Sequence, residues 1–60
     1  MYSIELTYNW QGKNKLYHLR IEQIPDGIIN IKESSYGLDY LFSILDDFGL
    51  DYPEQIPFKN

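Results

Sequence analysis

The stretch YSIELTYNW, residues 2–10, alternates strictly between apolar and polar side chains. Its apolar positions are Tyr2, Ile4, Leu6, Tyr8 and Trp10. Side chains that alternate with a period of two point to opposite faces of a sheet. This pattern predicts a strand over about residues 2–10, with one face buried in the core.

A second alternation predicts the partner strand over about residues 15–24, with Tyr17, Leu19 and Ile21 on one face. Between the two strands lies the polar linker Gln11-Gly12-Lys13-Asn14. Gly12 as the first residue of a two-residue turn allows the positive φ of a type II′ hairpin.

This turn implies a specific register. On the apolar face it pairs Tyr8 with Tyr17, Leu6 with Leu19 and Ile4 with Ile21, and on the other face it pairs Glu5 with Arg20. Apolar side chains meet apolar ones and an acid meets a base, so turn chemistry and pattern agree. A shift by one residue would turn the apolar side chains of one strand to the wrong face.

A second hairpin is indicated by Ile24-Pro25-Asp26-Gly27-Ile28. Proline suits the first position of a type I turn, and Gly27 suits the left-handed position that follows. We expect a short third strand over about residues 28–33, in which Ile29 and Ile31 continue the buried face.

The segment LDYLFSILDDFGLDY, from Leu38 to Tyr52, predicts an amphipathic helix over about residues 36–48. Its apolar stripe follows the i, i+3, i+4, i+7 spacing of one helical face and comprises Leu38, Leu41, Phe42, Leu45 and Phe48. A helix of this length is not stable alone, so it must pack on the sheet. The predicted fold class is α+β, a three-stranded antiparallel meander packed by one helix.

Both ends of this helix carry signals. Ser34 and Ser35 are candidate N-caps, and Asp39 lies in the first turn, where a carboxylate is favourable. Gly49 is the expected C-terminal stop.

Residues 49–60 contain Pro53 and Pro57 and are expected to form an extended arm rather than a helix. The arm also carries the apolar residues Leu50, Tyr52, Ile56 and Phe58. A disordered tail is usually poorer in apolar groups. We therefore expect the arm to pack either on its own domain or on a neighbouring chain.

Sixty residues are expected to form one domain at most, 1–60, and at this length only about 60% of the unfolded surface can be buried. The chain contains no cysteine and a single histidine, His18, so disulfides and a structural zinc site are not expected. The start MYSIELTYNW has no basic segment or unbroken apolar run, and no stretch has the ~20 apolar residues of a membrane span. A cytoplasmic protein is the expectation.

The net charge of −4 is unevenly distributed. Residues 1–32 hold four basic and three acidic residues, a charge of +1, whereas residues 33–60 hold one basic and six acidic residues, a charge of −5. The acidity therefore belongs to the helix and the arm. Such a surface repels nucleic acid and membrane headgroups and favours a basic protein partner.

Catalytic and cofactor chemistry is not expected. His18 falls on the polar face near Thr7 without an evident nucleophile, and Ser34, Ser35 and Ser43 occupy cap or helix-surface positions. Asp46 and Asp47 are neighbours on a helix, so their side chains point about 100° apart rather than at one substrate. The chain is predicted not to be an enzyme and to bind no cofactor.

Metal and direct nucleic-acid binding are not expected either. The spacing of Asp46, Asp47, Asp51 and Glu54 does not match a calcium loop. The aromatic residues Tyr2, Tyr8, Trp10 and Tyr17 are of a kind that stacks on bases, but they share the face assigned to the core beneath the helix. The basic residues are scattered and outnumbered.

A second apolar line on the helix, Tyr36, Tyr40 and Ile44 at four-residue spacing, ends at Asp47. Either the arm or another chain covers it. Acidic residues at a helix C-terminus lie at the unfavourable end of the dipole, which suggests a purpose other than helix stability. An apolar line bordered by carboxylates is typical of an anchor with a charged rim. The candidate partner-binding residues are Tyr36, Tyr40, Ile44, Asp46, Asp47, Asp51 and Glu54.

These observations predict a non-catalytic protein-binding module, such as an inhibitor, an antitoxin-like factor or a nucleic-acid mimic of the kind found in phages and mobile elements. The acidic helix end and the arm would dock on a basic partner. The alternative is a structural or accessory subunit that forms a homodimer or joins a larger assembly through a strand edge or the Tyr36, Tyr40, Ile44 line.

The predicted order of three strands and a helix over residues 2–48 resembles, in topology only, the start of HicB-type antitoxins, which neutralise a small RNA-cleaving toxin. The glycine and aromatic pattern of that family's first hairpin is absent here.

Overall fold

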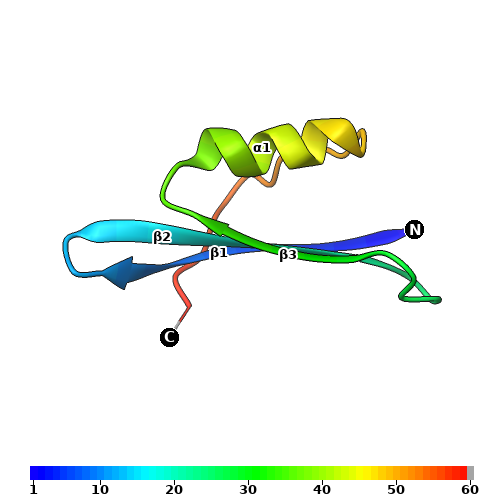
Figure 1. The fold of residues 1–60 in the computed structure, drawn as a ribbon, viewed down its shortest axis with the longest axis horizontal. Coiled ribbons are helices and arrows are strands. Elements are labelled where there is room, and N and C mark those ends of the chain that lie inside the picture. The colour runs from blue at the N-terminus through cyan, green and yellow to red at the C-terminus, as the bar shows by residue number, and fades with distance from the viewer. Residues whose placement is uncertain (60) are drawn as a thin grey trace.

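A computed structural model describes residues 1–59 of the chain. Its elements are β1 (Tyr2–Gln11), β2 (Asn14–Gln23), β3 (Asn30–Ser35) and α1 (Leu38–Asp47). The strands form one antiparallel sheet in the order β1-β2-β3, and α1 packs across one of its faces (Figure 1). The predicted fold class, a meander packed by one helix, is confirmed.

The first hairpin has the predicted register. Tyr8 pairs with Tyr17, Leu6 with Leu19, Ile4 with Ile21 and Glu5 with Arg20. Gly12 has a φ of 63°, and the Lys13 that follows has no positive φ, which is the combination that a type II′ turn requires. The alternating pattern and the turn glycine therefore act together to set one register.

The second hairpin is present, but its loop is wider than the predicted type I turn. The Gly27 N–H donates to the Gln23 carbonyl at 2.7 Å, and the Gln23 N–H donates to the Ile29 carbonyl at 2.8 Å. The cause is the pairing of Ile21 with Ile31, which places Gln23 opposite Ile29 and leaves residues 24–28 in the loop. The third strand consequently begins at Asn30 rather than near residue 28 and continues to Ser35.

The predicted N-caps are wrong, because Ser34 and Ser35 lie in β3 and pair with His18 and Tyr17. The N-cap of α1 is Gly37, which makes no side-chain capping bond. Ser35 contributes in a different way: its hydroxyl oxygen accepts the Gly37 N–H at 3.1 Å and so stabilises the bend between sheet and helix.

The C-terminus of α1 ends in a Schellman arrangement. Gly49, with a φ of 68°, donates its N–H to the Asp46 carbonyl at 3.0 Å, and Leu50 donates to the Leu45 carbonyl at 2.9 Å. Gly49 is thus the predicted stop, and the chain turns from there into the arm.

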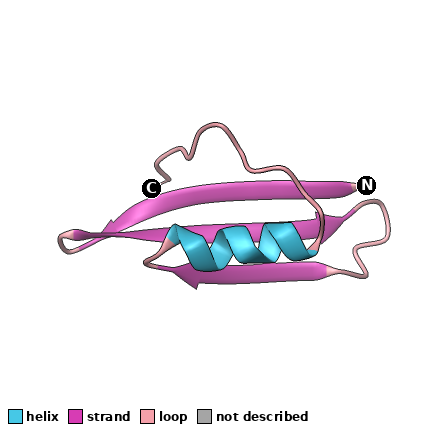
Figure 2. Cartoon of the chain, turned by 90° about the horizontal axis from the view of Figure 1, so that it is seen from above, coloured by secondary structure: helices cyan, strands magenta, loops and turns pink. Residues whose placement is uncertain are grey.

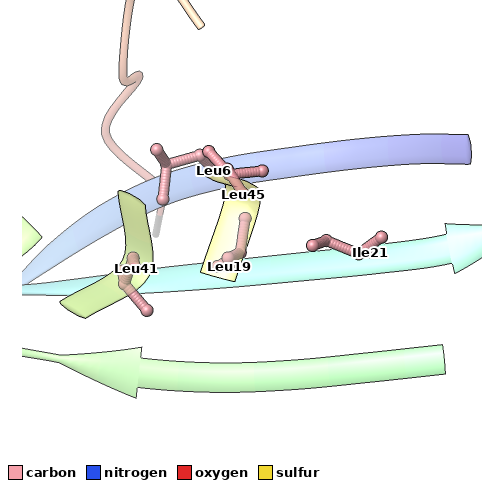
Figure 3. Close-up of a cluster of buried hydrophobic side chains, with 5 residues drawn as sticks. All are labelled: Leu6, Leu19, Ile21, Leu41 and Leu45. Atoms are coloured by element: carbon pink, nitrogen blue, oxygen red, sulfur yellow. The ribbon is translucent and has the colours of Figure 1, made fainter. Parts of the chain in front are cut away.

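The core lies between α1 and the sheet, and its buried side chains are Leu6, Leu19, Ile21, Leu41 and Leu45 (Figure 3). The ten-residue helix is about 15 Å long, whereas the ten-residue strands span about 33 Å. The tip of the first hairpin therefore extends beyond the helix (Figure 1). Trp10 is 52% exposed there, so the prediction that it lies beneath the helix is wrong.

The arm packs on its own domain. It leaves the end of α1, passes along the outer edge of β1 and ends on the side of the sheet away from the helix (Figures 1 and 2). The Tyr8 N–H donates to the Pro57 carbonyl at 3.1 Å, and the Lys59 N–H donates to the Tyr8 carbonyl at 2.8 Å, which gives a short parallel bridge between Tyr8 and Phe58. The arm thus protects part of an otherwise open strand edge.

Candidate protein-binding surface

Asp46, one of the predicted partner-binding residues, ties the arm to the helix. The Tyr52 hydroxyl lies 2.8 and 2.7 Å from its two carboxylate oxygens. The Tyr52 ring stacks on Phe42, with centroids 4.3 Å apart and planes 9° apart. The hydrogen bond to Asp46 raises the pKa of Tyr52, and desolvation and the Asp46 charge act in the same direction. Asp46 therefore has a structural role within the chain.

Asp47, Asp51 and Glu54 are exposed at the end of α1 and in the arm. Within residues 1–59, the ion pairs join Arg20 and Lys59 to Glu5 and Glu22, none of which belongs to this acidic group. Asp47, Asp51 and Glu54, the free acidic group, thus keep their charge uncompensated by any Lys or Arg of the described chain.

The apolar line Tyr36, Tyr40, Ile44 is only partly a helical stripe. Tyr36 precedes α1 and is 62% exposed, Tyr40 is 52% exposed, and Ile44 is half-buried against the core. The arm covers the other flank of α1, where Tyr52 stacks on Phe42. Phe42 is two residues from Tyr40 and from Ile44, and side chains two apart on a helix point about 160° apart around its axis. Tyr36 and Tyr40 thus stay open in the described chain.

The structure divides the predicted site residues between the two flanks of α1. Tyr40, Ile44 and Asp47 share one flank by their helical spacing. Asp46 faces the arm on the other flank, where it contacts Tyr52. The predicted surface is therefore a helix end with an adjoining arm rather than a single stripe.

Tyr8, Trp10 and Tyr17, which the sequence pattern places on one face, form an aromatic group at the hairpin tip, and Phe58 joins it, which was not predicted. Tyr8 contacts Trp10, Tyr17 and Phe58, with ring centroids 6.1, 6.2 and 5.6 Å apart. The Lys15 ammonium lies 4.8 Å from the centroid of the Tyr8 ring. Phe58 is about half exposed and extends the aromatic surface from the arm. Predicting the position of Phe58 would have required knowing that the arm returns to β1.

The face of the sheet opposite α1 carries a second polar arrangement. His18 lies opposite Thr7, as predicted, but its Nδ1 is 2.8 Å from the Ser34 hydroxyl and its Nε2 is 2.7 Å from Asn9 Oδ1. The Asn9 oxygen can only accept, so His18 Nε2 carries a proton and donates to it. The sequence indicated no evident nucleophile for His18, and the contact with the Ser34 hydroxyl was not predicted. Extending the third strand to Ser35 would have paired His18 with Ser34.

Two further properties bear on function. Within residues 1–59, no three His, Asp or Glu side chains gather closely enough to hold a metal ion. The helix of the described chain is too short to cross a membrane.

The fold and the free acidic group define a small α+β domain with an acidic helix end. Comparison with known proteins adds nothing to this class: no family model, no curated protein and no solved structure matches the chain.

Proposed function

We propose that the chain is a non-catalytic, cytoplasmic protein-binding module that docks on a basic partner through the free acidic group and the arm. It would act as an inhibitor or antitoxin-like factor. In the most specific form of the proposal, Asp47, Asp51 and Glu54 mimic nucleic-acid phosphates in a cationic groove of the partner.

The observation that carries the proposal is the absence, within residues 1–59, of any Lys or Arg paired with Asp47, Asp51 or Glu54. Carboxylates at a helix C-terminus cost stability, by about 0.3–1 kcal/mol each at low ionic strength. Asp47 stands in such a position without an intrachain partner to offset that cost. A basic partner would supply the missing charge.

The arm is also prepared for binding. The Tyr52 contacts with Phe42 and Asp46 hold its beginning, and the bridge to Tyr8 holds its end. Ordering a mobile side chain at an interface costs about 0.5–1.5 kcal/mol. An arm that is already packed avoids much of this cost.

The test is capture from a cell lysate with the immobilised full chain, comparing the wild type with Asp51→Lys and Asp26→Lys. Both variants make the same change in charge at an exposed loop aspartate, but Asp26 lies in the β2–β3 loop. We expect a basic protein that wild type and Asp26→Lys retain and Asp51→Lys loses. Equal capture by all three chains would contradict the proposal.

The hypothesis that the chain mimics a nucleic acid leads to an additional prediction. A double-stranded DNA or RNA that the captured protein binds should displace it from the chain, because both would occupy the same cationic groove. Simultaneous binding of the nucleic acid and the chain would reject the mimic and leave a protein-binding module.

A homodimer or assembly subunit is the second candidate, favoured by the position of β3. In residues 1–59 this strand has β2 on one side and no strand on the other, and the exposed Tyr36 follows it directly. An open edge is a template for pairing with another chain. Sedimentation equilibrium separates the candidates: a dimer at micromolar concentration favours the subunit, and a monomer favours the binding module.

A further inference from the structure

Two cations and two further polar side chains form a compact group on the face of the sheet opposite α1. Arg20 and His18 come from β2 and face Lys32 and Ser34 of β3 as directly opposite pairs. Cβ atoms of such pairs lie about 4.5–5.5 Å apart, and neighbours on one face of a strand lie about 6.6 Å apart. The four side chains, the donor block, thus enclose an area that one tetrahedral oxyanion would fill.

The charges of the donor block are unbalanced. Arg20 and Lys32 are like charges directly opposite each other, an arrangement that destabilises a sheet. Within residues 1–59, Lys32 takes part in no ion pair. An anion placed between the two cations would convert this repulsion into attraction.

The carboxylates nearest to the donor block leave Arg20 available. Glu5 and Glu22 approach its guanidinium only to 3.8 and 3.9 Å, longer than a hydrogen bond. They balance part of the Arg20 charge without using its directed N–H groups. The planar fork of these groups matches two oxygens of a phosphate.

The remaining two members are positioned in advance. His18 is held between Asn9 and Ser34 by bonds of 2.7 and 2.8 Å. The donor block lines a shallow polar hollow of about 640 Å³. Lys59, at the end of the arm, lines the same hollow and lies 3.6 Å from Glu5.

We propose that the donor block binds a dianionic oxyanion of the phosphate class, either inorganic phosphate or a phosphate monoester. Arg20 donates two hydrogen bonds, and Lys32 supplies the second charge and donates to a third oxygen. The binding involves no covalent step. The site lies on the sheet face opposite α1, so it does not depend on the protein-binding function proposed above.

The test is a titration of the ¹⁵N-labelled full chain with sodium phosphate, followed by NMR at constant ionic strength maintained with sodium chloride. We expect saturable shifts centred on residues 18–20 and 32–34. Lys32→Gln should weaken binding at least fivefold. Lys13→Gln, which makes the same charge change in the β1–β2 turn, should bind as the wild type does. Shifts that fail to saturate, or equal weakening in both variants, would overturn the proposal.

Thermal denaturation shows whether Lys32→Gln weakens binding only because it changes the fold. Without phosphate, Lys32→Gln should melt at or above the wild-type temperature, because the substitution removes the repulsion from Arg20. Added phosphate should raise the melting temperature of the wild type and Lys13→Gln but not of Lys32→Gln. An equal rise in all three chains would show binding elsewhere and reject the site.

A parallel titration with methyl phosphate distinguishes the two sources of the dianion. Binding at least as tight as that of inorganic phosphate identifies a monoester as the ligand. Binding of inorganic phosphate alone identifies the free ion. Absence of binding by both probes contradicts the proposal.

Discussion

The Tyr52 hydroxyl lies 2.8 and 2.7 Å from the two carboxylate oxygens of Asp46 and donates its proton to them. This contact joins the last turn of α1 to the arm, six residues further along the chain. It gives one acidic residue of the helix end a structural purpose. Asp47, Asp51 and Glu54, which share no such contact, are then the residues that remain for a partner.

Replacement of Tyr52 by phenylalanine tests the contact directly. The variant retains an aromatic ring to stack on Phe42 but loses the donor to Asp46. We expect a lower urea midpoint and faster proteolytic cleavage within residues 50–58, because the arm is held less firmly. Tyr36→Phe, at an exposed position before the helix, is the control and should behave as the wild type does. Indistinguishable cleavage of Tyr52→Phe and wild type would contradict this role.

The same contact makes stability depend on pH in the alkaline range. The folded-state pKa of Tyr52 is raised above the ordinary tyrosine value of about 10, first by its hydrogen bond to Asp46. The folded state therefore holds the proton more tightly than the unfolded state. The resulting stabilisation is complete below about pH 10 and is lost as pH rises through the raised pKa.

Urea denaturation of the wild type and Tyr52→Phe at a series of pH values measures this effect. The difference in unfolding free energy between the two chains should be constant from about pH 7 to 9 and should shrink above about pH 10. A difference that grows in that range would have the wrong sign for the contact.

Leu45 is the residue on which the docking of α1 most depends, because it is fully buried against the sheet. Leu45→Ala should cost about 2–5 kcal/mol. A domain of this size has only about 3–9 kcal/mol in total, so the variant should be largely or wholly unfolded by circular dichroism. Ile28→Ala, at a side chain that is 79% exposed, should change stability by less than about 0.5 kcal/mol. A cooperative, near wild-type transition for Leu45→Ala would refute the described core.

Asp47→Lys should stabilise the protein. The substitution replaces a carboxylate by a cation in the last turn of α1, which contains no basic residue. The helix dipole then favours the side chain, by about 0.3–1 kcal/mol at low ionic strength. The gain should diminish at high salt because exposed charges are screened. A loss of stability at low salt would mean that Asp47 has an intrachain role.

The sheet could be predicted from sequence because two independent signals coincide in its first hairpin. The period of two assigns Leu6 and Leu19 to the core, and Gly12 allows the two-residue turn that places them opposite each other. The helix could be predicted for a similar reason: the stripe through Leu41 and Leu45 and the stop at Gly49 agree.

The strand-to-helix boundary could not be predicted because the local signals conflict. Serine favours an N-cap, but Ser34 and Ser35 gain more as partners of β2, a tertiary effect that no short window contains. The donor block depends on the same boundary, since Ser34 faces His18 only when β3 reaches it. Predicting the contact between Asp46 and Tyr52 requires the path of the arm. The prolines of the arm limit its backbone conformations but do not determine its direction.

The measurement that tests the central claim most directly is the affinity of the captured basic partner for wild type and Asp47→Lys, at low and high salt, beside the stability of each chain. We predict that Asp47→Lys is at least as stable as wild type at low salt but binds at least tenfold more weakly, with a smaller dependence on salt. Equal affinity of the two chains at low salt would show that the acidic helix end takes no part in binding and would contradict the account.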